Sequence, residues 1–218
     1  MQNAFQIVET PPDADRSAAA HAEQRAAPRY TLLIRAAKLI CDAGEFLCVI
    51  RDVSETGISV RTFHPLPPTG PLLVELQNGD RHQLELVWQD TDRAGFRFLE
   101  AADISRIIES PSRFSKRPVR LNLCSAAEVT SMDGRIEDVE ITDLSQQGAR
   151  IACSCRFAID ESVKIRAPGL PETHAKVRWR KAGECGLIFE NTLQYGELAR
   201  IARRLQQGPD LRRPAPAR

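Results

Sequence analysis

The hexapeptide Asp-x-Ser-x-x-Gly occurs twice in this 218-residue chain, at 52–57 and at 143–148. Each copy follows a run of β-forming residues, at 46–50 and 136–141, and precedes another, at 58–60 and 149–152. Aspartate and serine side chains bond nearby backbone amides in turns, and glycine adopts positive φ at no steric cost. Each hexapeptide therefore predicts a turn inside a tight β-hairpin, with Gly57 and Gly148 in the positive-φ positions.

The hexapeptide belongs to a longer repeat with a constant spacing. Five landmarks recur after 91 residues, namely Asp52 and Asp143, Gly57 and Gly148, Trp88 and Trp179, Gly95 and Gly186, and Phe98 and Phe189. The structural repeats of solenoid proteins are much shorter than this. The spacing therefore predicts two copies of a whole domain of about 90 residues, which is large enough for an independent core.

An arginine pair stands ahead of each copy. The first is Arg25-x-x-x-Arg29 and the second is Arg113-x-x-x-Arg117, an offset of 88 residues. This offset predicts about three residues of insertion between the second pair and its hexapeptide, which hairpin loops accommodate at little cost. Pro28 disfavours helix at the residue before it, so we expect an extended arm. The recurrence of the pair indicates more than solvated surface charge.

The order of these features resembles the PilZ domain: Arg-x-x-x-Arg, then Asp-x-Ser-x-x-Gly, then a late Trp and Gly-x-x-Phe. The resemblance covers residues 25–100 and 113–190. It implies a mainly β protein with two tandem six-stranded antiparallel barrels, each followed by a C-terminal helix, that binds the bacterial second messenger cyclic di-GMP. We expect a disordered segment at 1–22, a first barrel with a linker helix at 23–110, a second barrel with a C-terminal helix at 111–207, and a disordered tail at 208–218.

Hydrophobic patterning and turn signals place the expected elements. The first copy has predicted strands at 31–40, 45–51, 58–62, 72–76, 80–88 and 95–99, and the second at 119–129, 135–142, 149–153, 162–166, 174–179 and 186–189. Helices are predicted at 101–110 and 191–207. Asn78 and Gly79 predict a type I′ hairpin turn. Trp88 and Phe98 are expected to be core anchors, and loss of the Trp179 side chain to unfold the second barrel.

A cyclic dinucleotide presents two phosphates and two guanines. The planar guanidinium of arginine can pair bidentately with phosphate or with a guanine edge, and it can stack on a base. Aspartate and serine oxygens can accept from the guanine donors, and glycine allows a close approach. The resemblance implies nucleotide contacts at the same positions: Arg25, Arg29, Asp52, Ser54, Gly57, Arg113, Arg117, Asp143, Ser145 and Gly148. We rank the second site higher because Ala149 replaces the bulkier Ile58 and because Lys116 and Arg120 add charge.

Composition narrows the compartment and the partners. The net charge of +1 gives no reason to expect a nucleic-acid or anionic-membrane partner. No apolar run approaches the roughly 20 residues needed to span a bilayer, and the N-terminus has no basic region followed by an apolar one, so we expect a cytoplasmic protein. Five of the six cysteines fall in predicted strands, which indicates buried free thiols in a reducing cytosol. Cys153 and Cys155 share a strand face, yet no Cys-x-x-Cys or histidine pair completes a zinc site, so no metal or other cofactor is predicted.

These features predict a non-enzymatic cyclic di-GMP receptor. Ligand binding would fold the arginine arms onto the barrels and change the contacts between the domains or with an unidentified protein partner. The alternative is a PilZ-like protein-interaction module in which one or both barrels do not bind nucleotide. An enzyme is not indicated, because Ser54 and Ser145 have no evident histidine base and no phosphate-binding glycine loop is present.

Overall fold

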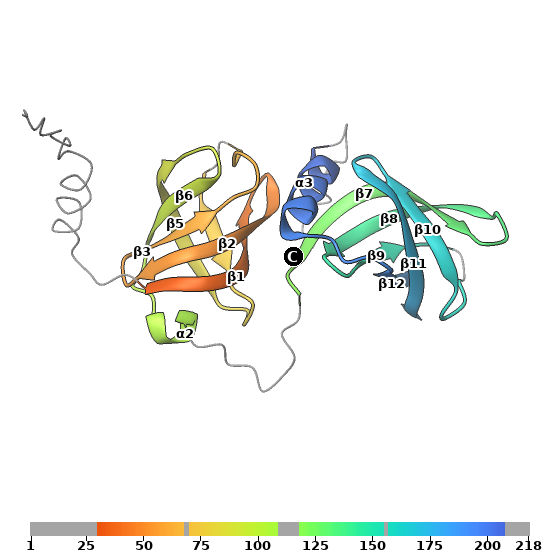
Figure 1. Cartoon of the computed structure of the whole chain (residues 1–218), viewed down its shortest axis with the longest axis horizontal. Coiled ribbons are helices and arrows are strands. Elements are labelled where there is room, and N and C mark those ends of the chain that lie inside the picture. Colours follow the sequence, from red (N-terminus) through yellow and green to blue (C-terminus); the bar gives the residue numbers. More distant parts are fainter. Residues whose placement is uncertain (1–29, 68–69, 109–117, 155–156, 208–218) are drawn as a thin grey trace, which may run out of the picture.

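The computed structural model describes residues 30–67, 70–108, 118–154 and 157–207, with the backbone alone for residues 30–34. Within these residues the chain forms two closed barrels of six antiparallel strands each, and two helices (Figure 1). Both predicted arginine pairs lie outside the described residues, as do the segments 1–22 and 208–218 that the sequence predicts to be disordered.

The first barrel closes in the order β1-β2-β3-β6-β5-β4. Its strands are β1 (Tyr30–Cys41), β2 (Gly44–Ser54), β3 (Gly57–Arg61), β4 (Leu72–Glu75), β5 (Arg81–Gln89) and β6 (Arg93–Phe98). The short helix α2 (Ile104–Ile108) follows, and its Ile107 is fully buried against the barrel core. Arg35 of β1 holds this helix, because its guanidinium donates hydrogen bonds to the carbonyl oxygens of Ile107 and Ile108.

The second barrel repeats this topology strand for strand, in the order β10-β11-β12-β9-β8-β7. Its strands are β7 (Arg120–Ser131), β8 (Ile136–Ser145), β9 (Gly148–Ala152), β10 (Ser162–Ala167), β11 (Leu170–Lys181) and β12 (Glu184–Phe189), and the helix α3 (Tyr195–Gln206) follows. The expected fold of two tandem six-stranded barrels, each followed by a helix, is confirmed.

Hairpin loops that contain a glycine join β4 to β5 in the first barrel and β7 to β8 in the second. Gly79 and Gly134 have φ values of 90° and 88°, and each lies in a three-residue hairpin loop. The hairpin predicted at Asn78 and Gly79 is present. Its assignment as type I′ is wrong, because that turn requires positive φ at both central residues and Asn78 does not have it. The sequence prediction also missed Gly169, whose φ of 92° lets β11 begin four residues earlier than expected.

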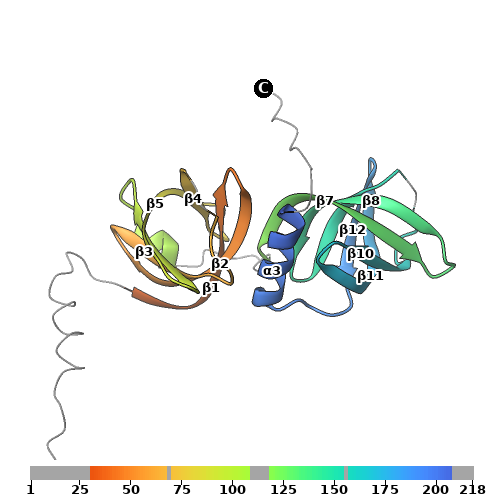
Figure 2. The same ribbon diagram turned by 90° about the horizontal axis from the view of Figure 1, so that it is seen from above.

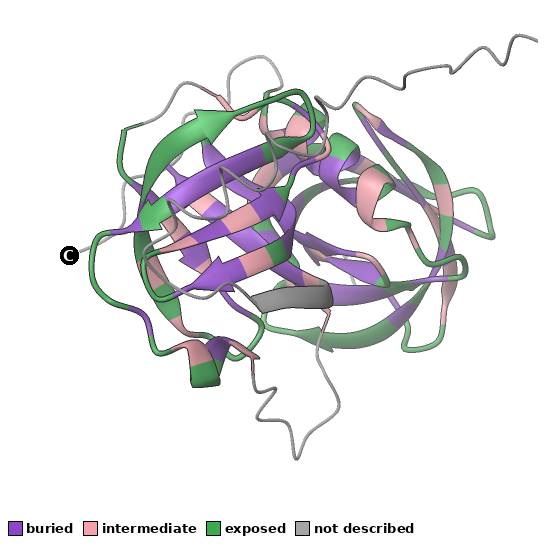
Figure 3. Cartoon of the chain, turned by 60° about the vertical axis from the view of Figure 1, so that its left-hand side comes forward, coloured by how far each residue is buried: buried purple, intermediate pink, exposed green. Residues whose placement is uncertain are grey.

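The core of each barrel consists of buried aliphatic and aromatic side chains. The parts of the ribbon that carry buried residues are purple in Figure 3. Strand β2 departs from simple alternation, because seven consecutive residues from Gly44 to Ile50 are buried. Phe46, Cys48 and Ile50 face the first core, whereas Leu47 packs in the cluster of the second barrel. A strand that is buried on both faces contains consecutive apolar residues, as residues 46–50 do.

The outer face of β2 is covered because α3 and β7 lie against it, so α3 stands between the two barrels (Figure 2). Gln206 at the end of α3 forms a reciprocal pair with the backbone of Glu45, accepting from its N–H at 2.8 Å and donating to its carbonyl oxygen at 2.9 Å. The Glu45 carboxylate accepts two hydrogen bonds from Asn122 of β7, at 2.8 and 2.9 Å, and one from Lys38 at 3.0 Å. These contacts join the two barrels through the buried residue Glu45.

Candidate functional site

The two Asp-x-Ser-x-x-Gly hexapeptides form matching hairpins that differ from the expected turns. The aspartate and the serine belong to the ends of β2 and β8, and the turn itself is only two residues long. Ser54 pairs with Gly57, and Ser145 pairs with Gly148, across the turn. Each serine hydroxyl donates to the carbonyl oxygen of its glycine, at 3.3 Å in the first barrel and 3.1 Å in the second. Both serines are buried, so in this structure they brace the hairpin.

The prediction that Gly57 and Gly148 supply positive φ is wrong, because neither glycine is in that region. They are required for space instead. A Cβ on Gly57 would lie 2.5 Å from the carbonyl oxygen of Phe96, and a Cβ on Gly148 would lie 2.0 Å from that of Leu187. Only glycine lets the neighbouring strand approach this closely.

A second repeated pair consists of a tryptophan lying over a glycine. A Cβ on Gly95 would lie 2.1 Å from Nε1 of Trp88, and a Cβ on Gly186 would lie 2.0 Å from Nε1 of Trp179. The register shifts immediately before each tryptophan and turns its side chain to the outside of the barrel. The indoles are 46% and 37% exposed, so the prediction of a core role for Trp88 is wrong, whereas the buried Phe98 is a core anchor as predicted.

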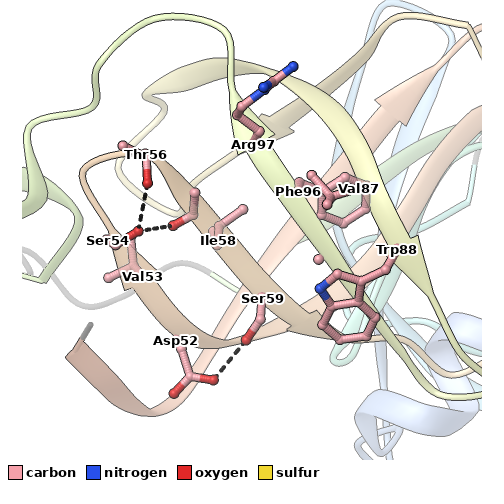
Figure 4. A pocket seen from close by; sticks show the side chains of 12 residues that line it. Asp52, Val53, Ser54, Thr56, Ile58, Ser59, Val87, Trp88, Phe96 and Arg97 are labelled. Atoms are coloured by element: carbon pink, nitrogen blue, oxygen red, sulfur yellow. Dashed lines mark hydrogen bonds between the residues drawn. The ribbon is translucent and has the colours of Figure 1, made fainter. Parts of the chain in front are cut away.

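These two pairs line one hollow on each barrel. The hollow of the first barrel has a volume of about 180 Å³, and its lining includes Asp52, Ser54, Gly57, Ser59, Trp88 and Gly95 (Figure 4). The hollow of the second has about 230 Å³, and its lining includes the equivalent residues Asp143, Ser145, Gly148, Arg150, Trp179 and Gly186. The fold therefore brings together six of the ten predicted site residues, three in each barrel.

The aspartate has a different partner in each hollow. Asp52 accepts a hydrogen bond from the hydroxyl of Ser59 at 2.8 Å, at the edge of the hollow opposite Trp88 (Figure 4). Asp143 is 4% exposed and forms ion pairs with Arg150, at 2.9 Å from Nε, and with Arg120, at 3.6 Å from Nη1. A buried carboxylate of this kind fixes the orientation of the guanidinium groups around it.

The second hollow is the more basic of the two within the described residues. Its lining contains Arg120, Arg150 and Arg178, whereas that of the first contains one arginine, Arg97, whose guanidinium pairs with Glu85 at 2.5 Å. The first hollow has Val87 where the second has Arg178, and Ile58 where it has Ala149.

The strand register identifies Arg120 as the counterpart of Arg29. Thr31 pairs with Asp52 in the first barrel, and Asn122 pairs with Asp143 in the second. Each residue of the second pair thus lies 91 positions after its counterpart in the first. No insertion therefore lies between these strand positions and the hexapeptides, and the sequence offset carried back to Arg29 falls on Arg120. Sequence reasoning treated Arg120 as additional charge, although its spacing from Asp143 equals that of Arg29 from Asp52.

The described residues also include the positions relevant to metal binding, thiols and membrane spans. Among the described residues no group of three or more histidine, cysteine or acidic side chains is placed to hold a metal ion. Of the cysteines in this part of the chain, Cys41, Cys48, Cys153 and Cys185 are buried and Cys124 is half-buried, and no disulfide joins any two of these five. Neither described helix is long and apolar enough to cross a membrane.

Fold and site together define a tandem β-barrel protein in which the same positions of a duplicated motif line an equivalent surface hollow on each barrel. The family model of the PilZ domain matches residues 23–110 and again residues 111–207. The chain therefore belongs to the PilZ domain family, as the sequence motifs predict. No curated protein matches the chain.

Several solved structures are similar to it. The PlzA protein of Borreliella burgdorferi in complex with c-di-GMP is 11% identical, with 86% of this chain and 98% of that chain covered and a TM-score of 0.34. The inhibitor of motility MotI/DgrA of Bacillus subtilis is 15% identical, with 78% and 94% covered and a TM-score of 0.33. YcgR of Escherichia coli in complex with c-di-GMP is 10% identical, with 79% and 81% covered and a TM-score of 0.33.

Proposed function

We propose that this protein is a non-enzymatic receptor for cyclic di-GMP, with its main binding site in the hollow of the second barrel. The observation that carries the proposal is the duplicated hollow: the same aspartate, serine, glycine and tryptophan positions surround it in both barrels. The second copy surrounds those positions with three arginines. Membership of the PilZ family supports the choice of ligand.

Each part of the second hollow suits one part of a cyclic dinucleotide. The guanidinium groups of Arg120 and Arg178 are more than half exposed, so they are available for phosphate oxygens or a guanine edge. Asp143 would hold Arg120 and Arg150 in place for this contact. The partly exposed indole of Trp179 offers a flat apolar surface on which a base can stack.

The arginine arm completes the proposed site. Arg113 and Arg117 precede Pro118 in the sequence, and Pro118 lines the hollow together with Arg120. We propose that Arg113, Arg117 and Arg120 clamp the ligand, and that Arg25 and Arg29 do the same for the first barrel. The first hollow would bind more weakly, because Val87 and Ser59 stand where the second has arginines.

Isothermal titration with cyclic di-GMP tests the proposal, since the first barrel supplies the matched substitutions. Arg178→Val and Arg150→Ser each give the second hollow the residue found in the first. Loss of one charge-assisted contact of roughly 1.5–3 kcal/mol should weaken binding about 10- to 150-fold. Arg166→Ala, which removes an exposed arginine paired with Glu128 outside both hollows, should leave the affinity unchanged.

Two results would overturn the proposal. The absence of measurable binding by the folded wild-type chain would remove the receptor function and leave the protein-interaction alternative. Binding that survives Arg178→Val and Arg150→Ser but disappears in Trp88→Ala would move the main site to the first barrel. The register makes Arg120, and not Arg117, the counterpart of Arg29. Arg120→Ala should therefore weaken cyclic di-GMP binding more than Arg117→Ala does.

A further inference from the structure

The interior of the second barrel contains a pair of cysteine thiols that neither the fold nor the proposed ligand site accounts for. Cys153 follows β9 and Cys185 lies in β12, 32 residues further along the chain. Their Sγ atoms are 3.5 Å apart, and the side chains are 9% and 2% exposed. We propose that Cys153 and Cys185 are an oxidation site, at which a small disulfide compound converts the two thiols into an intramolecular disulfide.

The backbone places the two cysteines on adjacent strands of the second barrel. The N–H of Cys153 donates to the carbonyl oxygen of Gly183 at 2.9 Å, and Cys185 pairs with Ile151 in the adjoining register. The cysteines are therefore diagonal neighbours on adjacent strands and share the barrel interior. A disulfide needs an Sγ–Sγ distance of about 2.05 Å, so the sulfur atoms have to approach by about 1.5 Å.

A reagent can reach this pair from one side. Cys153 lines a surface hollow of about 500 Å³ together with Ser154 and Gly183. Asp138 and Glu140 also line it, so an uncharged disulfide should enter more readily than an anionic one. Cys185 is more deeply buried, which makes Cys153 the first thiol to react.

The chemistry is two successive thiol–disulfide exchanges. The Cys153 thiolate attacks one sulfur of the small disulfide, forms a mixed disulfide and releases one small thiol. The Cys185 thiolate then attacks Sγ of Cys153, forms the protein disulfide and releases the second small thiol. The two protons of the protein thiols end on the two released thiols, and the small disulfide is the species reduced.

Two of the other described thiols, Cys48 and Cys124, are poor competitors. Burial raises the pKa of Cys48 to about 12, and burial together with the neighbouring Glu140 carboxylate raises that of Cys124 to about 11. The attacking species is the thiolate, so these two cysteines remain protonated and unreactive near neutral pH. Cys155 is the sequence neighbour that could compete, and the test below separates it from Cys185.

The test is oxidation of the reduced, full-length protein with 2-hydroxyethyl disulfide, followed by intact mass and peptide mapping. The expected product has lost two hydrogens, carries a peptide linked through Cys153 and Cys185, and melts roughly 5–10 °C higher than the reduced form. Cys155→Ser should give the same product, whereas Cys185→Ser should stop at the mixed disulfide on Cys153.

Two outcomes would overturn the proposal, and both can be seen in the wild-type chain. One is a protein that keeps all its thiols after exposure to the reagent in the native state. The other is a linkage that maps to Cys153 and Cys155 or to two different chains. Because the mapping uses wild-type protein, a poorly folding serine variant would not obscure the result.

Discussion

Replacement of Glu45 by alanine should destabilise both barrels together. Its carboxylate is buried, pairs with Lys38 at 3.0 Å and accepts two hydrogen bonds from Asn122 of the other barrel. Removal of one member of a buried ion pair costs about 3–5 kcal/mol. Lys38 keeps a second carboxylate partner, Glu75 at 3.0 Å, so we expect a loss near the lower limit, about 3 kcal/mol.

Thermal unfolding followed by circular dichroism measures this loss. For a chain of this size about 3 kcal/mol corresponds to a decrease in Tm of roughly 6–12 °C. Asn122→Ala, which keeps the ion pair and removes one hydrogen bond to the carboxylate, should cost about 1.5 kcal/mol. Glu85→Ala is the control, because it breaks an ion pair whose two side chains are more than half exposed, and its Tm should equal that of the wild type.

The outcome that would refute this reasoning is a Glu45→Ala protein as stable as Glu85→Ala. It would mean that the contacts of Glu45 stabilise the protein no more than the exposed ion pair between Glu85 and Arg97 does. Two separate unfolding transitions in the wild type, with only the first affected by Glu45→Ala, would show in addition that the barrels do not unfold as one unit.

Three further predictions concern single positions. Contrary to the expectation from the sequence, Trp179→Ala should leave the second barrel folded, with a stability loss of about 2 kcal/mol for a partly exposed side chain, and should weaken cyclic di-GMP binding at the proposed second-barrel site in titration. Gly148→Ala should lower stability in urea unfolding by at least about 2 kcal/mol, because the new Cβ meets a backbone oxygen, whereas Gly70→Ala, which faces open space, should not. Burial and the charge of Arg203 lower the pKa of His64, so below a pH of about 6.5 the unfolded chain binds more protons and stability falls. The decrease in Tm from pH 7.5 to 5.5 should therefore be smaller in His64→Gln than in the wild type.

The barrels could be predicted from the sequence because their signals are local. Turn glycines such as Gly79 and Gly134 mark hairpins through their own backbone geometry, and apolar residues between the turns mark the strands. The family motifs supply the order of the strands. A repeat of 91 residues then extends the same prediction to both halves of the chain.

The features that could not be predicted depend on contacts between distant residues. The large apolar side chain of Trp88 favours a core position, and nothing local shows that Gly95 on the next strand leaves room for the ring outside the barrel. Gly57 has the appearance of a turn glycine, yet the carbonyl oxygen that requires it belongs to a strand almost 40 residues away. The role of Arg120 could have been found from the constant offset, had it been carried back to Arg29.

The outer faces of the equivalent strands β2 and β8 differ in polarity. The first barrel presents Leu47 and Val49 on the outer face of β2; both are buried, and Leu47 packs in the cluster of the second barrel, whose α3 and β7 lie against this strand. The positions 91 residues later on β8 are Asp138 and Glu140, which are exposed and charged. A further copy of the domain that packed against β8 would meet no apolar surface and would have to bury these two carboxylates. Equivalent strands of the two barrels thus differ: β2 has an apolar contact surface, and β8 has exposed carboxylates at the same positions.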